Sequence, residues 1–233
     1  MVNKLENNLD KYRFERKFFI FELSVEEVES IIKLHPAIFS EVYHPRYINN
    51  IYLDSFGNKS YFDNVDGHND RAKFRIRWYG RIFGNIEKPA LEKKVKKGLL
   101  GSKSLFLIDP ISVDDNLTID TIKNTLHDSK IPDDLKFEVM CLRPVILNHY
   151  KRKYFQSADG NYRITIDSDL LFYRINCFNN SFQHKIYNDL AVILELKYDF
   201  DNDNSADSIT NYFPFRMTKS SKYVEGIEKL YLL

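Results

Sequence analysis

Lysine and arginine side chains recur at every second position of one short segment, and this spacing could form an anion-binding surface. The segment is RAKFRIRWYG, residues 71–80. Read with the two-residue period of a strand, it places Lys73, Arg75 and Arg77 on one face and apolar side chains on the other. A guanidinium offers planar paired donors to phosphate oxygens, and an ammonium is a compact point charge. This face therefore suits phosphate.

A second segment repeats the alternation and adds a carboxylate. In LEKKVKKG, residues 91–98, Glu92, Lys94 and Lys96 share one face, and the opposite face is less uniformly apolar because it also contains a lysine. The Phe-Gly-Asn sequence at 83–85 predicts a turn between the two segments. A hairpin of this kind would set the two charged faces side by side.

A strand with one charged and one apolar face is, by itself, typical of any half-buried antiparallel sheet whose charges face solvent. The argument for a site is recurrence, because about six predicted strands carry the pattern. The charged residues on these faces are Glu15, Lys17, Arg75, Arg77, Glu92, Lys94, Lys96, Arg152, Arg163, Asp167, Glu195 and Lys197.

The elements that would position these side chains are mostly strands. The alternation predicts strands at 12–22, 47–55, 71–80, 91–98, 105–108, within 137–156, at 162–170 and at 191–198. Asp159 and Gly160 predict a tight hairpin turn that would bring Arg152 and Arg163 onto neighbouring strands.

Helices are expected between and after the strands. Ser24 begins a capping box before a helix that ends near Pro36, and an acidic insertion at 109–134 contains a helix at 119–126. A last helix is expected within 217–233. Residues 56–70 and 101–104 have loop composition, rich in Gly, Asn, Asp or Ser.

Two arrangements of the charged strand faces remain open. On an open sheet the charges face solvent, whereas in a barrel of about eight strands they would line a lumen that fits one small ligand. A lumen lined by Arg and Lys requires a highly anionic ligand, because unpaired buried cations are costly. The interspersed glutamates suit Mg²⁺ or Mn²⁺ bridging carboxylate and phosphate oxygens, as metal-assisted phosphoryl transfer requires.

Composition narrows the class of protein. The chain has 233 residues, 43% hydrophobic and 29% charged, which suits one large globular domain or at most two small ones. A net charge of +1 and the lack of an aromatic stacking platform argue against a nucleic-acid partner. Two cysteines give no metal or disulfide framework, and no signal or membrane-length segment is present, so we expect a soluble cytoplasmic protein.

Several motifs occur in order over nearly the whole chain. They are RFERK at 13–17, IYLD at 51–54, KFRIR at 73–77, LEKK at 91–94, YKR at 150–152, RITID at 163–167, LELK at 194–197 and SKYVEG at 221–226. Together they resemble the VTC domain, the polyphosphate polymerase branch of the triphosphate tunnel metalloenzymes, or CYTH-like superfamily. The resemblance implies an α+β fold, an eight-stranded antiparallel β-barrel (a triphosphate tunnel) with flanking helices, formed by one domain over residues 1–233.

The resemblance also implies an activity and its residues. ATP or another triphosphate would bind in the tunnel, and the terminal phosphate of ATP would be transferred to a growing inorganic polyphosphate chain with Mn²⁺ or Mg²⁺. The residues implied to hold phosphates are Lys17, Arg75, Arg77, Lys94, Arg152, Arg163 and Lys222. Glu195 would bind the metal, and Glu15 would be a second acidic group near the metal or would orient a basic neighbour. The resemblance also implies that Arg13, Lys197 and Asp54 contribute to cofactor binding.

One departure bears on the choice of activity. Hydrolytic members of the superfamily begin with Glu-x-Glu-x-Lys, whereas Arg13 occupies the first of these positions here, as in the polymerase branch. Two alternatives stay open: a triphosphatase acting on tripolyphosphate or a nucleoside triphosphate, and a non-catalytic polyanion-binding module. The presence of Glu195 argues against the binding module.

Overall fold

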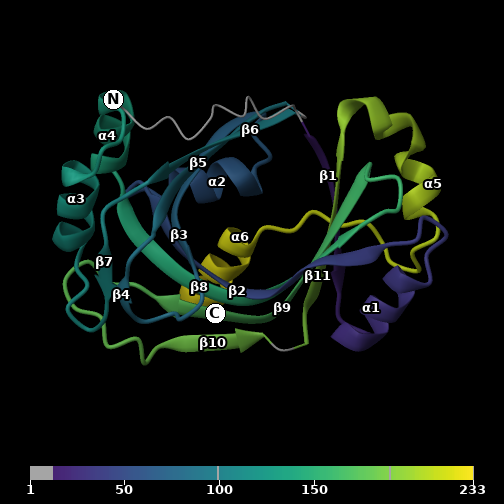
Figure 1. Ribbon diagram of the computed structural model, residues 1–233. Helices are drawn as coiled ribbons and strands as arrows, with labels where there is room; N and C mark the ends of the chain where they lie inside the picture. The colour runs from purple at the N-terminus through teal and green to yellow at the C-terminus, as the bar shows by residue number, and fades with distance from the viewer. Residues whose placement is uncertain (1–12, 99, 189, 233) are drawn as a thin grey trace.

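A large antiparallel sheet dominates the computed structural model, which describes residues 13–98, 100–188 and 190–232 (Figure 1). Eight strands follow one another in the order β1-β11-β9-β8-β2-β3-β5-β6. They are β1 (Arg13–Ile20), β2 (Ser40–Asp54), β3 (Asp70–Tyr79), β5 (Ala90–Lys97), β6 (Leu100–Leu107), β8 (Arg143–Gln156), β9 (Tyr162–Arg174) and β11 (Val192–Asp199). In addition, β10 (Lys185–Asn188) pairs with β9, and β4 (Gly84–Ile86) forms a separate ribbon with β7 (Ile111–Val113).

The sheet is curved, so that its two end strands approach each other. Within the described residues, β1 and β6 share no backbone pairing, so the predicted barrel is not closed by hydrogen bonds. Side chains bridge this side of the sheet instead, because Nζ of Lys94 on β5 lies 3.2 Å from Oε2 of Glu15 on β1. The antiparallel order of the eight strands agrees with the prediction. The predicted closure of the barrel is not found as backbone hydrogen bonds in the described residues.

Six α-helices accompany the sheet in the part of the chain that the structure describes. They are α1 (Val25–Lys33), α2 (Lys59–Val65), α3 (Ile119–Asp128), α4 (Asp133–Met140), α5 (Ala206–Thr210) and α6 (Lys222–Ile227), with a 3₁₀ turn at Phe200–Ser205 and a π-helical turn at Glu228–Leu232. The capping box at the start of α1 is confirmed: Glu27 N donates to Ser24 Oγ and Ser24 N donates to Glu27 Oε2.

Several local predictions were wrong. Residues 56–70 contain helix α2, and the segment expected to be a loop at 101–104 lies inside β6. The expected turn at 83–85 overlaps β4, so the connection from β3 to β5 is longer than a tight hairpin. Strand β2 begins at Ser40, well before the predicted strand at 47–55. The prediction missed its first half because that half is exposed on both faces and lacks the alternation of a half-buried strand.

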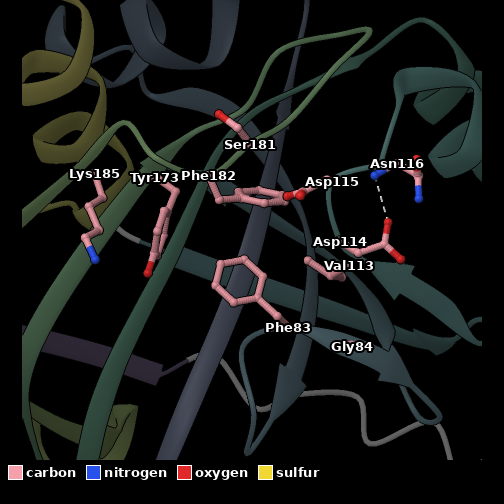
Figure 2. Close-up of a pocket in the computed structure, with 10 residues that line it drawn as sticks. All are labelled: Phe83, Gly84, Val113, Asp114, Asp115, Asn116, Tyr173, Ser181, Phe182 and Lys185. Carbon is pink, nitrogen blue, oxygen red and sulfur yellow. Dashed lines mark hydrogen bonds between the residues drawn. The ribbon is translucent and has the colours of Figure 1, made fainter.

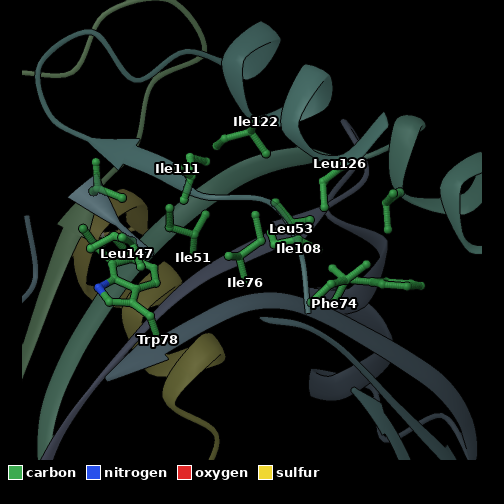
Figure 3. Close-up of a cluster of buried hydrophobic side chains, with 14 of the residues drawn as sticks. Ile51, Leu53, Phe74, Ile76, Trp78, Ile108, Ile111, Ile122, Leu126 and Leu147 are labelled. Carbon is green, nitrogen blue, oxygen red and sulfur yellow. The ribbon is translucent and has the colours of Figure 1, made fainter. Parts of the chain in front are cut away.

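The outer face of the sheet carries two apolar cores. One packs β2, β3, β5 and β8 under α3, α4 and the β4–β7 ribbon, and Figure 3 shows Ile122 and Leu126 of α3 facing Ile51 and Ile76 of the sheet. The acidic insertion is thus a helical cover, as its sequence predicted. The other core joins β1, β9 and β11 to α1 and α5.

The inner face of the sheet is the one that packs against α6, which Figure 1 shows within the curve of the sheet. A third apolar core joins α6 to this face through Tyr223 and Ile227 of the helix and Ile146 and Phe172 of the sheet. The contact is close at Gly226, where an added Cβ would lie 2.5 Å from Ile146 Cδ1. Glycine therefore lets α6 sit deep enough for its first residue to reach the inner face.

No helix of the described residues is long and apolar enough to cross a membrane. Both cysteines, Cys141 and Cys177, are free thiols, as expected.

Candidate active site

Charged residues from separate strands face one another on the inner face. Directly opposite positions on neighbouring strands place their side chains on the same face of a sheet. The opposite pairs include Lys17 with Glu195, Arg152 with Asp167, Arg75 with Glu92, Lys73 with Lys94, and Asn50 with Arg77. The charged side chains of these strands thus converge on one space instead of lying on several solvent-exposed surfaces.

Glu92 is the centre of a network on β3, β5 and β6. Its carboxylate is 1% exposed and accepts hydrogen bonds from Arg75, while Oε1 lies 3.2 Å from Nη1 of Arg77 and 3.4 Å from Nζ of Lys103. Burial alone would raise the pKa of Glu92, but the three cations hold it at about 2. The carboxylate therefore stays ionised and fixes both arginines in place.

Arg77 is held further by neutral groups. Its Nε donates to Oδ1 of Asn50 at 2.8 Å, and its Nη2 lies 3.5 Å from the hydroxyl of Tyr150. Asn50 in turn donates to Asn148 at 2.8 Å. The guanidinium is consequently oriented before any ligand arrives, which is the condition for strong electrostatic binding.

Glu195 is the centre of a second network on β1, β8 and β11. Its Oε1 lies 3.3 Å from Nζ of Lys17 and 3.8 Å from Nζ of Lys222, and its Oε2 lies 2.8 Å from Nζ of Lys197 and 3.5 Å from Nη2 of Arg152. Burial opposes ionisation, yet these cations hold the pKa of Glu195 well below its ordinary value.

Asp167 extends this network to α6. Its side chain is fully buried, and its Oδ2 lies 2.6 Å from Nη2 of Arg152 and 2.6 Å from Nζ of Lys222. Burial opposes ionisation here too, and the two cations lower the pKa of Asp167. Lys222, the first residue of α6, thus faces the strand carboxylates.

Glu15 and Glu195 converge on Lys17. Nζ of Lys17 lies 3.2 Å from Oε1 of Glu15 and 3.3 Å from Oε1 of Glu195, and Lys94 pairs with the other oxygen of Glu15. Burial and the charge of Glu195 raise the pKa of Glu15, but Lys17 and Lys94 lower it to about 2. The two predicted metal ligands are therefore close together and ionised.

The predicted residues do not all join these networks. Asp54 is buried, and its carboxylate accepts hydrogen bonds from the backbone of Ser60 and Tyr61 and from the Tyr223 hydroxyl, so it caps α2 and anchors α6. Arg163 is exposed at the start of β9, opposite Lys197. The side chain of Arg13 lies outside the described residues.

Other residues of the site were assigned no role from the sequence. Glu92 and Asp167 were placed on charged faces, but their buried ion pairs could not be foreseen from periodicity. Lys103 was missed because its segment, rich in Gly and Ser, has a weak alternation; the register places it opposite Lys94. Lys73 was placed on the correct face without a function.

The carboxylates of the site suit a divalent metal only together with ligands from outside the protein. The described residues contain no group of three or more His, Cys, Asp or Glu side chains close enough to hold a metal ion. Mg²⁺, however, is usually held by one or two carboxylates together with substrate phosphates and water. The convergence of Glu15 and Glu195 on one point fits that arrangement.

A separate pocket of about 480 Å³ lies outside these networks, between the β4–β7 ribbon and the segment before β10. Figure 2 shows the rings of Phe83 and Phe182 in this pocket, with Asp114 nearby accepting a hydrogen bond from the backbone of Asn116. Its lining contains none of the predicted site residues.

The sequence profile of the VTC domain matches residues 12–231. The chain therefore belongs to the VTC-domain family, as its motifs predicted. No protein of curated function matches the chain.

Solved structures with the same architecture have distant sequences. The chain is similar to protein PH1819 of Pyrococcus horikoshii OT3, with 13% identity, a TM-score of 0.51 and coverage of 94% of this chain and 99% of that one. It is similar to HpAC1 of Hippeastrum, described as a candidate adenylyl cyclase with a dominant triphosphatase activity, with 11% identity, a TM-score of 0.52 and coverage of 94% and 95%. A candidate adenylate cyclase of Vibrio parahaemolyticus gives 10% identity, a TM-score of 0.51 and coverage of 92% and 98%. These similarities support the tunnel-type fold.

Proposed function

We propose that this protein is a metal-dependent polyphosphate polymerase, which transfers the terminal phosphate of ATP to an inorganic polyphosphate chain. Membership of the VTC-domain family supports the proposal. The observation that carries it is the convergence of Arg75, Arg77, Arg152 and Lys222 with Glu195, from separate elements, on one inner face.

In this proposal the arginines bind and orient the phosphates. Arg75 and Arg77 share Glu92, so two guanidinium groups depend on one carboxylate and keep donors for a ligand. Arg152 and Lys222 approach from the other side of the space, where Asp167 holds them. Fixed cations on two sides of a triphosphate would position it and stabilise charge on the transferred group.

Mn²⁺ or Mg²⁺ would be held by Glu15 and Glu195 together with phosphate oxygens. The bound ion would supply charge neutralisation and polarise the transferred phosphoryl group. Lys17 lies between the two carboxylates and shields them from each other in their present arrangement. Lys94 pairs with Glu15 and Lys197 pairs with Glu195, and these cations help to lower the pKa values of the two carboxylates.

A triphosphatase is the second candidate, because the same cations and carboxylates would also serve transfer to water. Its support is the fold shared with HpAC1, a protein described as having dominant triphosphatase activity. For this chain, Arg13 in place of the first glutamate favours the polymerase.

Incubation of the purified protein with ATP and Mn²⁺, followed by gel separation of the phosphate products, tests the proposal. We expect long-chain polyphosphate and ADP. Free phosphate as the only product would favour the triphosphatase. No product, with triphosphate still bound, would indicate a binding module. The variant Lys88→Met, at an exposed lysine before β5, is the matched control and should behave as the wild type.

A further inference from the structure

Lys73 differs from Lys17, Lys94 and Lys222 in its partners, because each of those three lysines forms an ion pair with a carboxylate. It is half-buried on β3 and lies on the same face of this strand as Arg75 and Arg77. Its Nζ donates to Oδ1 of Asn64 at 2.8 Å and to Oγ of Ser221 at 2.9 Å, and both partners are neutral. Among the described residues no carboxylate forms an ion pair with it. Two hydrogen bonds therefore fix the position of this amine without neutralising its charge.

The charged groups that act most strongly on Lys73 are four cations, two of which also pair with Glu15. Lys17 comes from β1, Lys94 from β5, and Arg71 and Arg75 from β3 itself. Burial and these four cations lower the pKa of Lys73 to about 7.

The groups of α2 and of the start of α6 that contact Lys73 are neutral. They are the amide of Asn64, the hydroxyl of Ser221 and the ring of Tyr223, whose centroid is 5.9 Å from Nζ. Lys17 and Lys222 show the contrast, because their carboxylate partners raise their pKa values despite burial. Lys73 is thus held by neutral partners, without a carboxylate ion pair among the described residues.

We propose that Lys73 is a further anion-binding residue of this site, which contacts a phosphate oxygen of the bound triphosphate or polyphosphate and gains a proton from solvent as that anion binds. The inference rests on the proposed function, since it requires that the site binds such an anion. Before binding, four cations disfavour one more positive charge; a phosphate within ion-pair distance supplies the counter-charge and reverses that preference. Asn64 and Ser221 keep the amine in place in both states.

Calorimetric titration with inorganic tripolyphosphate, without metal and in two buffers of different ionisation enthalpy, measures the protons taken up. The ligand's own proton changes are common to all variants, so the difference between wild type and Lys73→Arg reports Lys73. For an amine of pKa about 7, we expect the wild type to take up most of one proton more than Lys73→Arg at about pH 8, and clearly less at about pH 6.

Affinity gives a second readout. We expect Lys73→Met to bind tripolyphosphate about tenfold more weakly, with a shallower salt dependence, because one charge-assisted contact is lost. Lys73→Arg keeps the charge and should restore the affinity without the proton uptake. Lys88→Met should match the wild type in both measurements.

Two results would overturn the inference and differ from each other. If the wild type binds tripolyphosphate but Lys73→Met and Lys73→Arg match it in affinity and proton uptake, the role of Lys73 is wrong and the proposed function stands. If the wild type does not bind tripolyphosphate, the proposed function and the inference are both wrong.

Discussion

The two sides of the inner face carry different ratios of cations to carboxylates. On the basic side, formed by β3, β5 and β6, Arg75, Arg77 and Lys103 share the single carboxylate of Glu92. The mixed side is formed by β1, β8, β9, β11 and α6. Its residues are Glu15, Asp167 and Glu195 with Lys17, Arg152, Lys197 and Lys222.

The difference assigns separate tasks to the two sides. The basic side has an excess of positive charge, which a phosphate ligand would compensate. The mixed side brings Glu15 and Glu195 together, which suits a divalent cation once phosphate is present. On both sides the carboxylates are ionised at neutral pH, because neighbouring cations lower their pKa values against the effect of burial. The charges are thus arranged before the ligand binds.

The largest effect is expected from Glu195→Gln on the mixed side. The amide keeps the shape but removes the proposed metal ligand, so the turnover of ATP should fall about a thousandfold, or about 4 kcal/mol. Steady-state assays with Mn²⁺ measure this, with Glu87→Gln, at an exposed glutamate, as the control. Activity within a factor of about three of the wild type would remove the metal role from Glu195.

A stability change is expected from Glu92→Gln on the basic side. Removal of this carboxylate leaves Arg75, Arg77 and Lys103 without the partner that they share, and breaking a buried pair of this kind costs about 3 kcal/mol. Denaturant unfolding measures the loss, and added tripolyphosphate should restore more stability to the variant than to the wild type. An unchanged free energy of unfolding would show that the arginines do not depend on Glu92.

The same pair of proteins gives a pH dependence. The pKa of Glu92 is lowered from 4.5 to about 2, so its stabilising effect is complete above about pH 4.5 and is lost as the pH falls toward 2. The difference in unfolding free energy between wild type and Glu92→Gln should therefore be constant from about pH 5 to 8 and shrink by more than half at about pH 3. A difference that is independent of pH over this range would contradict the ion pairing.

A smaller effect is expected from Lys103→Met. Lys103 is partly exposed on the basic side, so its loss should weaken tripolyphosphate binding about threefold to tenfold, and less at high salt. Lys97→Met is the matched control, because Lys97 is exposed on β5 but has the opposite strand parity to Glu92 and Lys94. Equal affinities for the two variants would restrict the basic side to its arginines.

The alternation of residue types placed Arg75 and Arg77 on one face of their strand. The residues around Arg152 alternate less regularly, although the register still sets Arg152 opposite Asp167. The family motifs added Lys222, which periodicity alone would have left as a solvated residue at the start of a helix.

The remaining features depend on contacts between distant segments. Asp54 has the parity of an inner-face residue, but β2 ends there, and the chain turns so that its carboxylate caps α2. Lys103 was missed because β6 forms by pairing with β5 and not by its own propensity. The neutral partners of Lys73 come from α2 and the start of α6, which no pattern within β3 reveals.

The most direct test of the division between the two sides is Mn²⁺ binding to Glu195→Gln in the presence of tripolyphosphate. The resonance signal of free Mn²⁺ measures this binding. The account predicts that the wild type binds Mn²⁺ with the anion, whereas the variant loses this binding and keeps its metal-free affinity for tripolyphosphate within about threefold. Mn²⁺ binding equal to the wild type, or loss of the anion together with the metal, would contradict it.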